Sequence, residues 1–390
     1  MKKINTPAWM ALALSAFIAS AACAADAVDA GKWKVSRAVT PPKLEKPLPK
    51  FPSNAVPKNV ILIIGDGMGR GSYDLASLWA HGDTRRLFMQ SLPVAGLCTT
   101  HSKNSSVTDS AASATAFACG EKTNNGMIGM APDGAHLESI ATLARGLGKS
   151  VAIVTSDSLQ GATPSSFFAH QAHRGMAAEI IADMAECGFE ILVGNSGSRD
   201  FVDKHREKLE ADGIHFVKSS KEMAAEPAGA RIIGQVSSST IFTVDDEELA
   251  NLAMESVKRL AKNANGFFMM VESTYPDKGG HDNNPDASVM GVIQADWVAK
   301  KAVDYASTSG DTLVIVTADH ETGGLSALMS MEEGSRPVIF YATTNHTGEP
   351  VPLYAYGPGA ERFGGVIDNT DIPRRIAEFW GGELPRVIPK

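Results

Sequence analysis

The segment that begins at Thr108 places a candidate serine nucleophile at the start of a short helix pattern. Asp109 and Ser110 precede an alanine-rich run that ends at Gly120. Polar residues before a helix and a glycine after it are the usual helix boundaries. The free N–H groups and the dipole at a helix start stabilise an anion, such as a phosphate or a serine alkoxide. By itself this pattern favours Ser110 as a helix cap, so a chemical role depends on other residues.

The elements that would position this serine are alternating strands and helices. Four continuous apolar runs have the length of strands that are buried on both faces, and they occupy residues 60–64, 151–155, 267–271 and 313–317. Helical patterns lie between them, at residues 136–147, 175–187, 246–262 and 288–306. This alternation predicts an α/β fold with a doubly wound, mostly parallel central sheet and helices on both faces. We expect edge strands at 338–341 and 351–356, and peripheral helix and loop over 195–240.

Polar side chains that could bind a metal or a phosphate follow each of the four predicted strands. They are Asp66 after the first, Thr163 and Arg174 beyond the second, Glu272, Asp277 and His281 after the third, and Asp319 and His320 after the fourth. One acidic residue at a strand end is commonly a loop cap. Because ligands bind beyond the carboxyl ends of parallel strands, four such ends together predict one shared site.

Six motifs, in this order, resemble the alkaline phosphatase family. They are Gly65-Asp66-Gly67-Met68-Gly69, Asp109-Ser110-Ala111-Ala112, Thr163-Pro164, Glu272 to His281, Thr317 to Gly324, and His346-Thr347-Gly348. The Gly-Asp-Gly step alone is a weak signal, whereas the ordered set of six is specific. The resemblance extends from about residue 59 to the last residue.

The resemblance implies two zinc ions, held by histidines and carboxylates, and one magnesium ion, held by oxygens alone. The first zinc set is Asp277, His281 and His346; the second is Asp66, Ser110, Asp319 and His320; the magnesium set is Asp66, Thr163 and Glu272. These ligand types agree with the general preferences of the two metals. Two cations about 4 Å apart can stabilise the attacking and leaving oxygens of an in-line displacement.

The activity implied by the resemblance is hydrolysis of phosphate monoesters to an alcohol and inorganic phosphate. Ser110 would be the nucleophile and would carry the phosphoserine intermediate. Arg174 would bind the phosphate through its planar fork, and Asp109 would orient that arginine. Lys278 would contribute positive charge through water. The expected partners are therefore small phosphate-monoester substrates.

Two positions depart from the family pattern. Many members have an acid or a histidine two residues before the magnesium-ligating threonine, where this chain has Gly161. We therefore expect weaker magnesium binding and a Lys278 that lacks a counter-charge, and we expect Gly161→Asp to reverse both effects. Only 21 residues separate Gly324 from His346, where members often carry a large insertion that forms a crown over a dimer partner. We therefore expect only a small crown, and the sequence agrees with either a homodimer or a monomer.

Four other functions compete with this prediction. A phosphodiesterase or nucleotide pyrophosphatase of the same superfamily would normally lack the third metal site, for which all three protein ligands are present. A sulfatase needs a Cys or Ser followed by x-Pro-x-Arg, which the residues after Ser110 do not provide. A non-catalytic phosphate-binding protein would have lost a ligand or the nucleophile, and none is lost. A phosphoglycerate mutase relative would be cytosolic, which the N-terminus argues against.

The first 24 residues have the pattern of a secretory signal peptide. Lys2 and Lys3 precede an apolar run that ends in Ala22-Cys23-Ala24. We expect residues 25–57 to form a proline-rich extended segment and residues 58–390 a single catalytic domain. The protein would then be periplasmic or secreted, and lipoprotein export at Cys23 stays an alternative to soluble export. The membrane is not an expected partner, because no later stretch is long and apolar enough to span it.

The composition argues against a nucleic-acid-binding protein. The net charge is −8, and it becomes −10 once Lys2 and Lys3 are removed, so a phosphate substrate requires local positive charge. Three cysteines remain after cleavage, and they are Cys98, Cys119 and Cys187. They allow at most one internal disulfide, whose pairing the spacing does not reveal.

Overall fold

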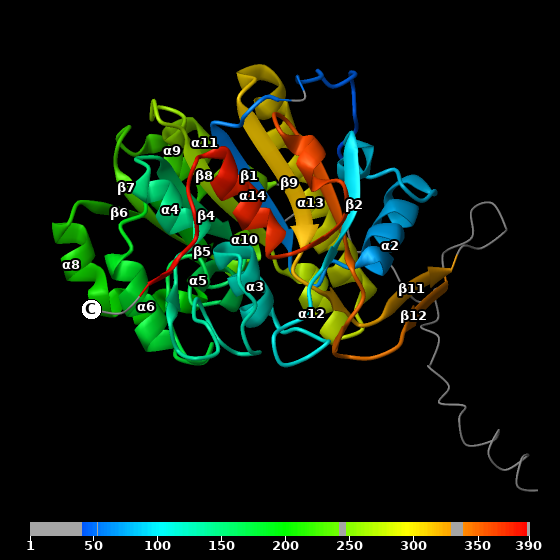
Figure 1. Cartoon of the computed structure of the whole chain (residues 1–390), viewed down its shortest axis with the longest axis horizontal. Helices are drawn as coiled ribbons and strands as arrows, with labels where there is room; N and C mark the ends of the chain where they lie inside the picture. The colour runs from blue at the N-terminus through cyan, green and yellow to red at the C-terminus, as the bar shows by residue number, and fades with distance from the viewer. Residues whose placement is uncertain (1–40, 53, 242–246, 329–337, 388–390) are drawn as a thin grey trace, which may run out of the picture.

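A ten-stranded sheet with helices on both faces forms the centre of the protein (Figure 1). The structure is a computed structural model that describes residues 41–52, 54–241, 247–328 and 338–387. The predicted α/β fold with a mostly parallel central sheet is confirmed, because β14 alone runs antiparallel to its neighbours. The predicted signal peptide lies outside the described residues. Among the described residues, no helix has the length and apolar character needed to cross a membrane.

The strands of the main sheet lie side by side in an order that differs from their order along the chain. Across the sheet they are β15 (Gly365–Asp368), β2 (Val94–Thr99), β14 (Val351–Tyr356), β9 (Thr312–Ala318), β1 (Asn59–Gly65), β8 (Phe267–Ser273), β4 (Ser150–Thr155), β5 (Ile191–Asn195), β7 (Arg231–Val236) and β6 (Ile214–Val217). Three small ladders pair β10 (Glu321–Thr322) with β13 (His346–Thr347), β11 (Leu325–Leu328) with β12 (Val338–Tyr341), and β3 (His136–Leu137) with β16 (Arg386–Val387).

Helices cover both faces of this sheet. One face carries α2 (Arg70–His81), α11 (Glu248–Leu260) and α13 (Pro285–Ser309), and the other carries α3 (Ser110–Cys119), α4 (Ile140–Gly146) and α14 (Asp371–Phe379). The remaining helices are α5 (Ala162–Ser165), α6 (Ala177–Glu186), α7 (Arg199–Val202), α8 (Arg206–Ala211), α9 (Ser220–Ala225), α10 (Ser238–Ile241) and α12 (Tyr275–His281).

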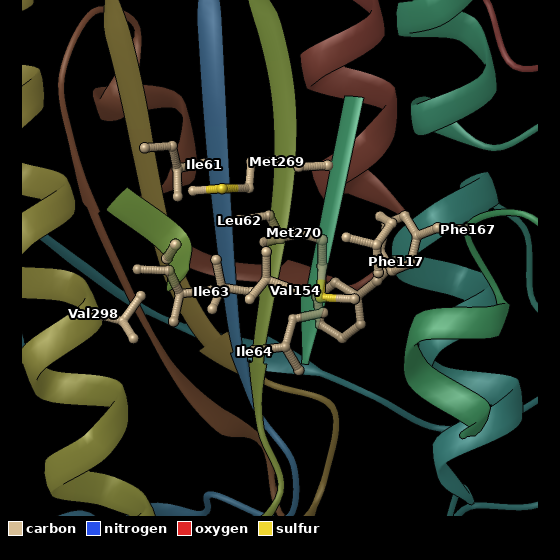
Figure 2. Close-up of a cluster of buried hydrophobic side chains, with 14 of the residues drawn as sticks. Ile61, Leu62, Ile63, Ile64, Phe117, Val154, Phe167, Met269, Met270 and Val298 are labelled. Atoms are coloured by element: carbon tan, nitrogen blue, oxygen red, sulfur yellow. The ribbon is translucent and has the colours of Figure 1, made fainter. Parts of the chain in front are cut away.

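The centre of the core lies around β1, whose seven residues are all buried. Figure 2 shows Val298 of α13 on one side of this strand and Phe117 of α3 on the other side. A strand that is covered on both faces buries consecutive side chains, which explains its unbroken apolar run. Each such side chain contributes about 1.5–3 kcal/mol through the hydrophobic effect. The core therefore fixes the central strands, and with them the ends from which the polar residues extend.

Three predictions about secondary structure are wrong. Residues 351–356 form an interior strand, because β14 pairs with β9 on one side and with β2 on the other. The segment 195–240 is more than peripheral helix and loop, since it supplies β6 and β7 to the main sheet. The predicted helix at 136–147 begins only at Ile140, because His136 and Leu137 pair with β16. Residues 338–341 form a strand as expected, but this strand, β12, pairs with β11 in a small hairpin and does not lie at an edge of the central sheet.

The three cysteines at positions 98, 119 and 187 form no disulfide within the described part of the chain. Cys98 and Cys119 are buried, and Cys187 is partly buried. Burial raises the pKa of Cys187 to about 11, so its thiol stays protonated at neutral pH. These cysteines therefore behave as small apolar residues of the core.

Candidate active site

The carboxyl ends of four adjacent strands, β9, β1, β8 and β4, bring the predicted site residues together. The register aligns Gly65 of β1 with Ala318 of β9, and Ile64 of β1 with Glu272 of β8. Asp66 and Asp319 each follow directly after their strands, so both acids and Glu272 meet at one edge of the sheet. This is the place where open α/β sheets bind ligands.

Ser110 is the first residue of α3, and its side chain faces this sheet edge. Asp109 caps the helix, because its carboxylate accepts a hydrogen bond of 2.9 Å from the Ala112 N–H. Ser110 is therefore not the cap, and its hydroxyl is left for other contacts. The Ser110 Oγ lies 3.2 Å from His320 Nε2, and the residue is 3% exposed. Gly120 ends the helix in the left-handed conformation, as predicted.

Asp66, Asp319 and His320 form the first group of possible metal ligands, and all three are buried. His320 Nε2 is 3.5 Å from Asp66 Oδ1 and 3.2 Å from Asp319 Oδ2. Asp319 Oδ1 accepts hydrogen bonds from the backbone N–H groups of Gly67 and His320. By contrast, Asp66 Oδ1 and Asp319 Oδ2 have no hydrogen-bond partner among the described residues. Buried oxygens without a donor are costly, so a cation fits between them.

Asp277, His281 and His346 form a second group beside the first. Asp277 and His281 lie on the short helix α12, and His346 arrives from β13, which pairs with the β10 strand directly after His320. Asp277 Oδ1 is 3.3 Å from His281 Nε2 and 3.4 Å from His346 Nε2. The two Nε2 atoms are 3.2 Å apart. Three potential ligand atoms thus converge on one point.

The histidines of the second group are held so that Nε2 faces the other ligands. His281 Nδ1 lies 2.6 Å from the carbonyl oxygen of Thr344, and His346 Nδ1 lies 2.8 Å from that of Thr108. A carbonyl oxygen only accepts, so each Nδ1 carries a hydrogen and donates it. In the neutral ring the Nε2 lone pair is then available to a metal, and such outer contacts usually orient ligand histidines.

Glu272, Thr163 and Asp66 supply a third set of oxygens on the β8 and β4 side. Glu272 and Thr163 are both 1% exposed. The Thr155 hydroxyl donates to the Glu272 carboxylate. Thr163 Oγ1 is buried and, within the residues that the structure describes, has no hydrogen-bond partner. An oxygen-only set of this kind is what magnesium prefers.

The acids at the strand ends carry an unfavourable concentration of negative charge. Burial, and then the neighbouring Asp319, raise the pKa of Asp66 well above its usual range. Burial and nearby Asp277 raise the pKa of Asp319 to about 7, and burial and nearby Asp157 raise that of Glu272 to about 8. Asp277 is the exception, because hydrogen bonds to His281 and His346 outweigh its burial and lower its pKa.

His320 responds in the opposite direction to the acids. Burial, and then the neighbouring His346, lower the pKa of His320 well below its usual range, so the ring is neutral. A neutral imidazole is the form that binds metal. Cations would therefore both offset the repulsion among the carboxylates and find a neutral nitrogen ligand.

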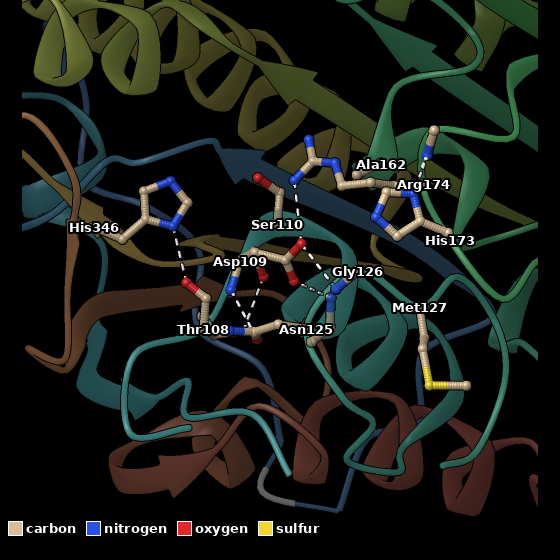
Figure 3. Close-up of polar contacts among 12 residues, drawn as sticks. Thr108, Asp109, Ser110, Asn125, Gly126, Met127, Ala162, His173, Arg174 and His346 are labelled. Carbon is tan, nitrogen blue, oxygen red and sulfur yellow. Dashed lines mark hydrogen bonds and ion pairs between the residues drawn. The ribbon is translucent and has the colours of Figure 1, made fainter. Parts of the chain in front are cut away.

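Arg174 and His346 lie on opposite sides of Ser110, and Asp109 holds the arginine in its place (Figure 3). Asp109 Oδ2 is 3.4 Å from Arg174 Nη1, and it also accepts a hydrogen bond from the Gly126 N–H. The arginine side chain is 40% exposed, so an anion from solvent can reach it. A guanidinium in this position can bind an anion beside Ser110.

The structure assigns a different surrounding to Lys278 than the sequence predicts. The expectation that Lys278 lacks a counter-charge is wrong, because its Nζ lies 3.8 Å from Asp157 Oδ1. A Cβ at Gly161 would lie 2.5 Å from Asp157 Oδ2, so a carboxylate already occupies that space. Gly161→Asp would collide with Asp157, which removes the basis for the predicted gain.

Two residues with contacts to the site were missed at the sequence level. Asp157 was missed because it lies in the loop after β4, whose path the sequence pattern does not specify. Thr322 was part of the motif after the fourth strand without an assigned role, yet its hydroxyl donates to Asp277 Oδ1 over 2.6 Å. The same hydroxyl lies 3.2 Å from His320 Nδ1, so Thr322 links the two ligand groups.

Comparison with known proteins places this geometry in a family. A family model described as alkaline phosphatase matches residues 57–193, 197–338 and 327–381. The chain is 30% identical to alkaline phosphatase H of Pseudomonas aeruginosa (strain UCBPP-PA14), over 81% of this chain and 83% of that protein. It is 28% identical to alkaline phosphatase 3 of Bacillus subtilis (strain 168), over 82% of this chain and 88% of that protein.

A solved structure also resembles this chain. A variant of the TAB5 alkaline phosphatase, solved with magnesium bound in its M3 site, superposes with a TM-score of 0.73 and 28% identity, over 84% of this chain and 99% of that chain. The sequence motifs, the sheet order and these matches agree with one another. The chain belongs to the alkaline phosphatase family, and it is a phosphatase.

Proposed function

We propose that this enzyme hydrolyses phosphate monoesters through a phosphoserine at Ser110, with two zinc ions and one magnesium ion. The observation that supports this most is the position of the Ser110 hydroxyl, 3.2 Å from His320 Nε2 and beside buried oxygens without partners. A serine at a helix start would otherwise be an ordinary helix residue. Its neighbours make it a nucleophile that faces a cation site.

The donor sets fit the three metal ions that the family resemblance implies. Asp277, His281 and His346 would hold one zinc ion. Asp66, Asp319 and His320, with the Ser110 oxygen, would hold the other, and Asp66, Thr163 and Glu272 would hold the magnesium ion. When bound, these ions would lower the pKa of the serine hydroxyl and of water and offset the negative charge on the phosphate oxygens.

Ser110 carries the covalent chemistry. Its Oγ attacks phosphorus, an Oγ–P bond forms, and the bond from phosphorus to the ester oxygen breaks. The alcohol leaves with a proton, and the serine proton passes to solvent. A water molecule then attacks the phosphoserine, which releases inorganic phosphate and returns the serine hydroxyl. The positive end of the α3 dipole, which begins at Ser110, favours the negatively charged states of both steps.

Arg174 and Lys278 position the phosphate. The Arg174 fork would bind two phosphate oxygens, while Asp109 keeps the guanidinium over the start of α3. Asp109 also caps the helix that carries Ser110, so one carboxylate aligns both the nucleophile and the arginine. Lys278 lies farther out beside Asp157 and adds positive charge through water.

The cellular context belongs to the same proposal. The signal-peptide pattern over residues 1–24 supports export to the periplasm or the medium. The net negative charge supports small phosphate esters over nucleic acids as partners. A homodimer and a monomer both fit the short segment between Gly324 and His346, and molar mass in solution distinguishes them.

Turnover of three substrate classes, measured side by side, tests this function. The substrates are a phosphate monoester, a phosphate diester and a sulfate ester, each with the same aryl leaving group. We expect the monoester to have the highest kcat/KM by several orders of magnitude. A diester that is hydrolysed faster would instead establish the phosphodiesterase alternative, and phosphate binding without turnover would establish a binding protein.

Acid quenching tests the intermediate. With a radiolabelled monoester, the label should appear on Ser110 and be absent from the Ser110→Ala variant. That variant should lose on the order of 10³-fold or more in kcat, because removing a nucleophile commonly costs that much. Ser307→Ala, at the end of α13 that leads into the start of β9 and so away from the carboxyl ends of the strands, is the matched control and should keep full labelling. Label on a histidine or an aspartate would contradict the mechanism.

A further inference from the structure

Asp157 lies in the loop that joins β4 to α5, and its backbone is anchored on both sides. Its N–H donates a 2.8 Å hydrogen bond to Thr155 Oγ1, and its carbonyl accepts a 2.6 Å hydrogen bond from the Asn195 N–H. The Thr155 hydroxyl in turn donates to the Glu272 carboxylate. One short chain of hydrogen bonds therefore links the Asp157 backbone to the third ligand set.

The space that the Asp157 carboxylate occupies depends on Gly161. A Cβ at position 161 would come within 2.5 Å of Asp157 Oδ2 and 2.9 Å of the Ser158 carbonyl oxygen. Gly161 has an extended backbone with φ −55° and ψ 153°, so nothing in its conformation requires a glycine. Instead, the close approach of the Asp157 carboxylate is what requires a glycine at this position. Any side chain at 161 would displace it.

The carboxylate has two charged neighbours of opposite sign. Asp157 Oδ1 lies 3.8 Å from Lys278 Nζ, in a partly exposed pair. Its negative charge also reaches Glu272, a buried member of the third ligand set, and it is one of the causes that raise the pKa of that carboxyl. The Asp157 carboxylate therefore acts both on the Lys278 ammonium and on a carboxylate of the third ligand set.

We propose that Asp157 is a positioning residue that strengthens cation binding at the Asp66, Thr163 and Glu272 oxygens and holds Lys278 back from the phosphate. The proposal rests on the proposed function, because it assigns the third ligand set to magnesium. Thr163 Oγ1, buried and unpartnered among the described residues, independently marks this set as a ligand site.

Magnesium chemistry explains why such a neighbour would matter. Magnesium prefers six oxygens and retains several waters, so three protein oxygens leave half of its shell to water. A carboxylate beside the set accepts hydrogen bonds from such waters and adds negative potential. Outer partners of this kind typically change metal affinity by about 10–100-fold. The ion pair with Lys278 offsets the electrostatic cost of adding the negative charge of Asp157 to those of the ligand set.

Magnesium and phosphate titrations of Asp157→Asn in the full-length, zinc-loaded enzyme test this role. Equilibrium dialysis gives the magnesium affinity without reference to turnover, and inhibition by inorganic phosphate reports on Lys278. Asp200→Asn is the matched control, because it removes one exposed aspartate, on helix α7. Gly161→Ala is a second variant, in which the added Cβ displaces the Asp157 carboxylate.

We expect Asp157→Asn to weaken magnesium binding by about 10-fold or more and to strengthen phosphate inhibition several-fold. Gly161→Ala should shift both quantities in the same direction. Saturating magnesium should restore kcat in both variants, which a folding defect would not allow. Magnesium affinity equal to that of Asp200→Asn would overturn the proposal. If the unmodified enzyme neither binds magnesium nor hydrolyses monoesters, the proposed function itself fails, which is a separate result.

Discussion

Two buried carboxylates in this protein have the same raised pKa and opposite surroundings. Asp319, at the end of β9, and Asp296, in the middle of α13, are both 0% exposed, and each has a pKa raised to about 7. Both oxygens of Asp296 accept backbone hydrogen bonds, from Phe88 at 3.0 Å and Met89 at 2.8 Å. Asp319 Oδ2 has no such donor among the described residues, and Asp66 and His320 lie beside it.

The difference shows which observation marks a functional group. Burial is the largest cause of the raised pKa at both positions, so the pKa alone does not distinguish them. Asp296 has its hydrogen-bond partners within the fold and ties the Phe88 loop to α13. Asp319 presents an unsatisfied oxygen toward other potential ligands. The described residues leave Asp319 Oδ2 without a hydrogen-bond donor, and a bound cation would take the place of that donor.

Removing metal ions should have the largest effect, and it should act on only one of these two regions. Dialysis against a chelator should abolish monoesterase activity, and zinc with magnesium should restore it. The unfolding temperature should also fall, because a ligand present at 1,000 times its Kd stabilises the folded state by about 4 kcal/mol. Full activity in chelated protein, verified as metal-free by elemental analysis, would contradict the assignment of the strand-end acids.

His346→Ala should have a smaller and more local effect within the metal region. The change leaves Asp277 and His281 as the only side chains of the second group, so one zinc ion should bind much more weakly. Elemental analysis should find close to one equivalent less zinc than in the unmodified protein. The control is His215→Ala, on the outermost strand β6, where the histidine pairs with Glu226. Undiminished zinc in His346→Ala would remove this residue from the site.

The same contrast explains what could be predicted from the sequence. The four central strands were predictable, because strands covered on both faces have unbroken apolar runs such as 60–64. The outer strands were not, since β6 contains His215 and half of its side chains are partly exposed. Likewise, β14 became interior only because β2 folds back beside it, and that pairing joins segments more than 250 residues apart.

The site was predictable where its residues follow strands directly, as Asp66 and Asp319 do. Asp157 was not, because its role depends on the turn between β4 and α5 that brings it to Lys278. Asp296 was not predictable either, since a single acid within a helix pattern is normally exposed. Sequence motifs thus located the groups that we propose bind the reacting atoms. The residues that support these groups are set by contacts between loops, and such contacts have no fixed spacing in the sequence.

Asp296→Asn should change stability and leave the chemistry intact. An asparagine of the same shape keeps one acceptor oxygen, so one of the Phe88 and Met89 N–H groups faces an amide nitrogen. A buried donor without an acceptor costs about 1–3 kcal/mol, which lowers the unfolding temperature by a few degrees in a protein of this size. Zinc content and kcat should match the unmodified enzyme. A large loss of zinc would mean that Asp296 supports the metal region after all.

The pH dependence of that stability difference is the finest test of the comparison. The pKa of Asp296 is about 7 in the folded chain and about 4 in an unfolded one. Below pH about 4, both states hold the proton. As the pH rises toward 7, the unfolded state releases its proton first, so the stability that the protonated carboxyl contributes is lost across this window. Asparagine has no such proton, and the deficit of Asp296→Asn should therefore be largest near pH 4.5 and shrink toward pH 8.

Urea unfolding of both chains with chelator present measures this, because the strand-end acids then contribute equally and cancel in the difference. Curves that stay parallel from pH 4.5 to 8 would mean that the two hydrogen bonds to Asp296 keep its carboxylate ionised, and that its burial is fully compensated within the fold.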